Sequence, residues 1–166
     1  VKLGREVVVE ADRMGVPDED VLERHYQRAV EQGGDPEFLP ALRGGFTGVV
    51  GIVRCGEGPI IGMRFDIDAV DMRESNSPEH RPVKEGFASV NPEAMHSCGH
   101  DGHATIGLGV AATLAQIKDE LRGTIKLVFQ PAEEGVRGAK AIVSSGILDD
   151  VQYMLASHLG SGTPTG

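Results

Sequence analysis

The sequence predicts an α/β fold, a three-layer sandwich in which a mixed, largely parallel sheet is flanked by helices. Apolar, β-branched runs bounded by Gly, Pro or Asp recur along the chain, as expected of strands. From residue 59 onwards these runs alternate with helical patterns, and a strand, helix, strand order requires crossover connections between parallel strands. The chain has 166 residues, 40% of them hydrophobic, which suits one domain with its own core.

Five segments are predicted to be strands because each combines β-branched or aromatic residues with turn residues at its ends. They are REVVVE (5–10), FTGVVGIV (46–53), PIIGMRFDI (59–67), GTIKLVFQ (123–130) and VQYMLASH (151–158). We expect the last three to be parallel, with their carboxyl ends at one edge of the sheet. Open sheets of this kind bind ligands at that edge.

Helices are predicted where apolar residues recur at helical spacing between an acidic or polar start and a Gly stop. The segments are DEDVLERHYQRAVEQGG (18–34), PEFLPALRGG (36–45), GHATIGLGVAATLAQIKDELRG (102–123) and GAKAIVSSGI (138–147). Residues 71–94 are polar, contain three prolines and show little periodicity. A loop of that length is more often functional or mobile than a plain connector.

Composition excludes several classes of partner. The net charge of -9 and the isoelectric point near 5.1 argue against nucleic-acid binding, which requires clustered Lys and Arg. The chain contains no spanning run of about 18 apolar residues, so no membrane partner is expected. Two cysteines and no apolar signal segment favour a reducing cytoplasm, in which Cys98 is free for chemistry.

Chemically capable residues cluster in MHSCGHDGHATIGLG (95–109), which places Cys98 and three histidines within eight positions. Carboxylates or a histidine also lie at the ends of three predicted strands: Asp66 with Asp68 at one end, Glu133 with Glu134 just past another, and His158 at a third. Taken singly, each is also compatible with a structural role, as a solvated carboxylate, an acid at a helix start or an interior histidine. Together, a thiolate, imidazoles and carboxylates at one sheet edge predict a site for a divalent metal ion.

The sequence says less about the remaining histidines and Cys55. His103 lies three positions after His100, where a helix start places both on one face, so it is either a supporting partner of the site or a cap. His96 is an uncertain member of the cluster. His25 and His80 are interpreted as surface residues, and Cys55 as part of a turn.

Four motifs in series, RFDIDAV, MHSCGHDGHATIGLG, FQPAEEGVRGA and SHLGSGTPTG, resemble the metal-dependent amidohydrolases of the M20 peptidase family. The resemblance is to the branch with hippurate, auxin-conjugate and aminobenzoyl-glutamate hydrolases, and it covers essentially the whole chain. It implies a zinc-peptidase-like catalytic domain. The family's dimerisation domain and the C-terminal part of its catalytic domain, with a further metal-binding histidine, are not found in residues 1–166. The chain is therefore expected to be a partial catalytic domain that is inactive alone.

The resemblance also implies residue roles. Cys98, His100, Glu134 and His158 would bind two divalent metal ions, Mn or Zn, and Glu133 would be the general base. Asp68 would orient a metal ligand, with Asp66 as a second candidate for that task. The implied reaction is cleavage of p-aminobenzoyl-glutamate to p-aminobenzoate and glutamate, a step of folate catabolism. A homodimer or a hetero-oligomer with a paralogous subunit is expected.

Alternative functions remain open at this point. Within the family, a hippurate-like N-acyl-amino-acid hydrolase uses the same site on another small molecule. A non-catalytic metal-binding module would bind the ion without turnover, and a thiol enzyme would use Cys98 as nucleophile with His100 as base. Neither of the last two explains paired acids at two separate strand ends.

Overall fold

The computed structural model describes residues 4–6, 12–160 and 162, and its centre is one mixed sheet. The strands are β1 (Gly4–Glu6), β2 (Val49–Arg54), β3 (Ile60–Asp66), β4 (Thr124–Gln130) and β5 (Tyr153–Ala156), in the order β1-β2-β4-β3-β5. β3 is parallel to both β4 and β5, whereas β2 is antiparallel to β1 and to β4. Only β2 among the described strands therefore runs the opposite way, and the predicted α/β class with a mixed, largely parallel sheet is confirmed.

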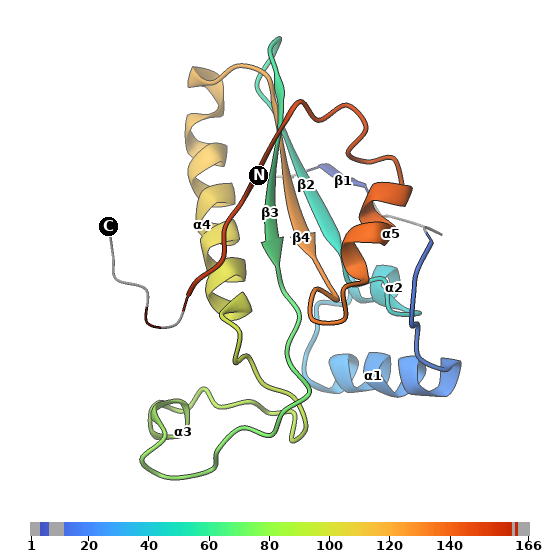
Figure 1. Ribbon diagram of the computed structural model, residues 1–166, viewed down its shortest axis with the longest axis vertical. Helices are drawn as coiled ribbons and strands as arrows, with labels where there is room; N and C mark the ends of the chain where they lie inside the picture. Colours follow the sequence, from blue (N-terminus) through green and yellow to red (C-terminus); the bar gives the residue numbers. More distant parts are fainter. Residues whose placement is uncertain (1–3, 7–11, 161, 163–166) are drawn as a thin grey trace.

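The helices of the described chain are α1 (Glu19–Glu31), α2 (Leu39–Leu42), α3 (Arg81–Glu85), α4 (His100–Ile117) and α5 (Gly138–Ser144). α4 covers one face of the sheet and α5 the other, which gives the predicted three layers (Figure 1). Of the strand expected over 5–10, only residues 5 and 6 fall within β1. Residues 7–10 lie outside the described residues.

The core follows the alternation of side chains along β4. Ile125 and Leu127 face α4 and pack with its Ala111 and Leu114, while Val128 faces the other layer and packs with Ile142 of α5. α4 lies close to the sheet at Gly107, where a Cβ atom would stand 2.6 Å from Phe129 Cε1. This close packing fixes the start of α4 relative to the ends of β3 and β4.

The predicted end of the long helix was wrong. α4 stops at Ile117, and Lys118–Glu120 tighten into a 3-10 turn before Leu121 becomes extended. Gly123 is not a helix cap. It has φ of +85° and approaches the Pro59 carbonyl so closely that a Cβ would lie 2.2 Å from that oxygen. The glycine is needed for entry into β4, where only a residue without Cβ fits.

The polar segment 71–94 is an excursion from the sheet that contains α3 (Figure 1). Val70 and Met95 form an isolated bridge at its base. Inside it, the Glu74 carboxylate accepts a hydrogen bond from the Ser89 backbone N–H at 2.5 Å and pairs with His80 Nε2 at 2.9 Å. Within the described residues, no helix has both the length and the apolar character needed to cross a membrane.

Candidate metal centre

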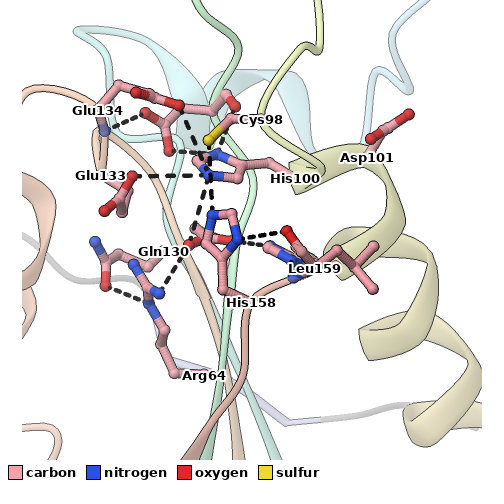
Figure 2. A network of polar contacts seen from close by, with 12 residues as sticks. Arg64, Cys98, His100, Asp101, Gln130, Glu133, Glu134, His158 and Leu159 are labelled. Carbon is pink, nitrogen blue, oxygen red and sulfur yellow. Dashed lines mark hydrogen bonds and ion pairs between the residues drawn. The ribbon is translucent and has the colours of Figure 1, made fainter. Parts of the chain in front are cut away.

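The site lies where the parallel strands β3, β4 and β5 end and α4 begins. Each of the seven candidate residues predicted from sequence has a polar contact with another of the seven. Figure 2 shows Glu133, Glu134, Cys98 and His158 gathered around His100, whereas Asp101 projects from α4 away from the cluster. The seven are Asp66, Asp68, Cys98, His100, Glu133, Glu134 and His158.

His100 is the centre of this arrangement and is fully buried. Its Nδ1 lies 2.9 Å from the backbone carbonyl of Asp68. A carbonyl oxygen can only accept, so Nδ1 carries a proton, and in the neutral ring Nε2 presents a lone pair. Among the described residues no hydrogen-bond donor reaches Nε2, which instead lies 3.7 Å from Glu133 Oε2 and 3.8 Å from Glu134 Oε1.

Asp68 connects two of the candidate ligands. Its backbone oxygen accepts the proton of His100 Nδ1, and its Oδ2 accepts the backbone N–H of Glu134 at 3.0 Å. One residue therefore holds both the ring of His100 and the loop that follows β4. Its other carboxylate oxygen, Oδ1, is buried without a hydrogen-bond donor in the described structure.

The turn before α4 positions Cys98. Gly99 has φ of +84°, a left-handed conformation that suits glycine and turns the chain between Cys98 and His100. Cys98 Sγ lies 3.6 Å from His158 Nε2. A hydrogen bond to Glu134 is the largest cause raising the pKa of the Cys98 thiol, and loss of water and the negative charges of nearby carboxylates add to it.

The loop after β4 presents the adjacent acids Glu133 and Glu134. Ala132 and Val136 both have positive φ, 56° and 54°, an uncommon backbone conformation for residues with a Cβ. Gly138 closes the loop so tightly that a Cβ there would lie 1.7 Å from the Pro131 carbonyl oxygen. With this turn, the side chains of the neighbouring residues Glu133 and Glu134 both approach His100 Nε2.

Sequence reasoning missed Arg64 and Gln130. Arg64 forms an ion pair with Asp66 Oδ2 at 2.7 Å and donates from Nε to Gln130 Oε1 at 2.9 Å. The alternation of side chains along a strand could have indicated Arg64, because it is two positions before Asp66 and lies on the same face of β3. Burial raises the pKa of the Asp66 carboxyl, but the His103 hydrogen bond and the Arg64 charge outweigh burial, and the net pKa is lowered.

His103, whose role the sequence left open, also belongs to the site. It is buried, its Nδ1 pairs with Asp66 Oδ1, and its Nε2 lies 2.8 Å from the backbone nitrogen of Leu159. Its ring meets the ring of His158 edge to face, with centroids 4.6 Å apart. His96 is exposed, and His25 and His80 lie on α1 and in the excursion, away from the cluster.

The donor set fits a divalent metal ion. His100 Nε2 and Asp68 Oδ1 are buried without a hydrogen-bond partner in the described structure, and a divalent cation beside them would supply one. Cys98, His100 and Glu134 each offer an atom within 4.8 Å of the others, and so do Asp66, His100, His103 and His158. Mixed sulfur, nitrogen and oxygen donors suit zinc and similar ions.

The sequence matches a known protein family and several characterised hydrolases. The family model described as Peptidase family M20/M25/M40 matches residues 62–166. The chain is 53% identical over 99% of its length to one of the subunits of p-aminobenzoyl-glutamate hydrolase from Escherichia coli. It is equally similar, 53% over 99%, to indole-3-acetyl-aspartic acid hydrolase of Enterobacter agglomerans. It spans 38% of the length of each of these relatives.

Two solved structures are similar to this chain in both fold and sequence. An aminobenzoyl-glutamate utilization protein from Klebsiella pneumoniae superposes with a TM-score of 0.79 at 41% identity, covering 98% of this chain and 36% of that one. A Bacillus subtilis protein described as a dinuclear metal binding peptidase from the M20 family superposes with a TM-score of 0.64 at 30% identity, covering 93% and 41%.

Proposed function

The chain belongs to the M20/M25/M40 peptidase family, and we propose that its protein is a metal-dependent amidohydrolase that cleaves p-aminobenzoyl-glutamate to p-aminobenzoate and glutamate. The observation that carries the proposal is the buried Nε2 of His100, which lies among the carboxylates of Asp66, Glu133 and Glu134 without a hydrogen-bond partner among the described residues. Cys98, His100, Glu134 and His158 would hold two divalent ions, Mn or Zn. A bound divalent ion would supply Lewis-acid activation of water and of the amide carbonyl.

Glu133 is the proposed general base. Its carboxylate approaches His100 Nε2, and its side chain is 37% exposed, so water can reach it. It can therefore take a proton from an attacking water and deliver it to the departing amine nitrogen. Asp68 is the proposed orienting carboxylate because it accepts hydrogen bonds from both His100 and Glu134. Asp66 lies 3.7 Å from His100 Nε2 but is itself paired with Arg64 and His103.

The substrate class rests on the relatives. One is named for p-aminobenzoyl-glutamate and the other for indole-3-acetyl-aspartic acid. Both names describe an aromatic acyl group in amide linkage to an acidic amino acid. We propose that class, with p-aminobenzoyl-glutamate first and a role in folate catabolism. Because the Escherichia coli relative is named as one of the subunits of its hydrolase, a hetero-oligomer with a second, different chain is proposed as the assembly.

The test is Glu133→Gln in the full-length protein. We expect metal content to remain, because Gln keeps the shape of the side chain and the proposed ligands are unchanged, while turnover of p-aminobenzoyl-glutamate falls by roughly 100-fold or more. Metal is measured by elemental analysis and turnover by release of p-aminobenzoate, with indole-3-acetyl-aspartate as the competing substrate. Unchanged turnover would show a different base, and the absence of turnover of either substrate in the wild type would reject the proposed class.

A further inference from the structure

We propose that His103 is a positioning residue whose Nε2 accepts the backbone N–H of Leu159 and thereby sets the orientation of the neighbouring His158. The inference rests on the proposed metal centre, in which His158 is a ligand. It assigns a task to a buried histidine that the proposed reaction does not use. Figure 2 shows Leu159 and His158 beside the start of α4.

The tautomer of His103 follows from its partners. The Leu159 nitrogen is a backbone amide and can only donate, so His103 Nε2, at 2.8 Å, must be the acceptor. The proton of the neutral ring is then on Nδ1, which donates to Asp66 Oδ1. Both ring nitrogens are engaged, so His103 has no lone pair left for a metal ion although it lies near the other donors.

Asp66 is held in turn by a chain of buried groups. Arg64 pairs with Asp66 Oδ2 at 2.7 Å and also donates to Gln130, the last residue of β4. Asp66 and His103 are 0% and 2% exposed, and Gln130 is 5% exposed. Because water has little access to these groups, the direction of the His103 ring is fixed by protein contacts from β3 and β4.

Apart from the rings of His100 and His103 and the Cys98 thiol, the described polar contact of His158 is with Leu159. It is exposed and follows the end of β5, and its Nδ1 lies 2.8 Å from the Leu159 carbonyl oxygen. That carbonyl requires a proton on Nδ1, so in the neutral ring Nε2 is an acceptor, and it faces Cys98 Sγ, 3.6 Å away. Leu159 therefore joins the two histidines: its N–H is held by His103, and its C=O fixes the ring of His158.

The test compares two substitutions in the full-length protein. In His103→Gln the amide oxygen stands near the place of Nε2 and can accept the Leu159 N–H. In His103→Asn the shorter amide stands near Nδ1 and can donate to Asp66, but it leaves the Leu159 N–H without an acceptor. Zinc affinity is measured by competition with a chromophoric chelator. We expect a loss of roughly 10- to 100-fold for Asn and a loss of only a few-fold for Gln.

His25→Asn, on the exposed surface of α1, is the matched control and should leave zinc affinity unchanged. Zinc affinities of the Asn and Gln variants equal to that of the wild type would overturn the inference. Equal, severe losses in both, with unchanged thermal unfolding of the metal-free proteins, would overturn it in favour of direct ligation. A wild type without zinc affinity would instead reject the metal centre itself.

A second measurement needs no variant. Two-bond proton–nitrogen correlation spectra of metal-free wild-type protein show which ring nitrogen of a histidine is protonated. The resonances of His103 can be assigned through the contact with Leu159. We expect the Nδ1–H tautomer, and an Nε2–H tautomer would overturn the inference even if both substitutions prevented folding.

Discussion

The two histidines proposed as metal ligands are held in the same way. His100 and His158 each place Nδ1 against a backbone carbonyl, that of Asp68 at 2.9 Å and that of Leu159 at 2.8 Å. In each case the carbonyl keeps the proton on Nδ1 and leaves the Nε2 lone pair available. Metal binding by the neutral rings then requires no change of tautomer, whereas the Cys98 thiol must lose its proton to bind as a thiolate.

The Cys98 thiol should therefore release a proton when metal binds. Because its contact with Glu134 raises the pKa of Cys98, the thiol is protonated at neutral pH and must lose its proton to bind as a thiolate. We expect zinc binding at pH 7 to release about one proton attributable to Cys98, and zinc affinity to rise with pH. Titration calorimetry in buffers of different ionisation enthalpy measures this release.

Two substitutions give the controls for proton release. Cys98→Ser should reduce zinc affinity and remove that proton, because a hydroxyl is a poorer ligand and does not ionise in this range. Cys55, which packs against the α4 core cluster and not in the site, should tolerate Ser without a change in zinc binding. Equal zinc affinity in wild type and Cys98→Ser would contradict the ligand role.

Residue types and strand ends were enough to predict which side chains gather. The order of RFDIDAV, the cysteine-histidine segment, AEEG and SHLG in a parallel sheet predicts their meeting at one edge. The links behind them were not predictable in this way. The contacts of Arg64 with Gln130 and of His103 with Leu159 depend on the register of β3 with β4 and on the path of the chain after β5.

At the scale of an element, α4 is the helix that brings the site together, and its glycines differ in environment. A Cβ on Gly107 would lie 2.6 Å from Phe129 Cε1 and 2.9 Å from the Phe65 ring, whereas a Cβ on Gly109 meets nothing within 4 Å. Gly109→Ala should stabilise the protein by about 0.5–1 kcal/mol, because alanine favours the helix. Gly107→Ala should destabilise it by about 1–3 kcal/mol through overpacking.

Both free energies of unfolding are measured by urea denaturation, and the two variants are controls for each other within one helix. Equal effects of the two substitutions would contradict the close packing of α4 on β3 and β4.

The helix α4 itself was predictable from its apolar spacing, but its end was not. Packing of Gly123 against Pro59 sets the start of β4 and requires the chain to leave the helix earlier than the pattern suggested.

A second contact at this scale joins β4 to the connection after α5. The buried Lys126 Nζ donates to the Ile147 carbonyl at 2.6 Å and to Asp150 Oδ1 at 2.5 Å. The hydrogen bond from Lys126 lowers the pKa of Asp150. A carboxyl whose pKa is depressed by folding stabilises the folded state above its unfolded pKa, and this contribution is lost as pH falls through the folded value.

Asp150→Asn should therefore lower the free energy of unfolding at pH 7, and its difference from wild type should shrink as the pH falls below roughly 4. Asp149→Asn is the matched control, since Asp149 is the exposed neighbour and has no ion pair with Lys126 among the described contacts. Urea denaturation across pH measures the difference. If the difference in the free energy of unfolding between wild type and Asp150→Asn were constant with pH, the ionised form of Asp150 would contribute nothing to stability.

For the whole molecule, the site gathers four acidic residues of a chain that is already acidic overall. The net charge is -9, and Asp66, Asp68, Glu133 and Glu134 meet beside Cys98 at one sheet edge. Such crowding opposes folding unless cations offset it. A metal ion that binds only the folded state must therefore stabilise the molecule as its concentration rises.

We accordingly expect zinc to raise the melting temperature of the full-length metal-free protein. At a free zinc concentration one hundred times the dissociation constant, binding should add about 2.7 kcal/mol to the free energy of unfolding. Magnesium at the same concentration should raise it far less, because magnesium prefers octahedral oxygen ligands and the centre offers a thiol and imidazoles. Thermal unfolding followed by circular dichroism measures both shifts. Cys98→Ser should reduce the zinc shift and leave the magnesium shift unchanged. If magnesium stabilised the wild type as much as zinc, the cluster would be acting as a simple patch of negative charge, and the role proposed for Cys98 and the histidines as metal ligands would be wrong.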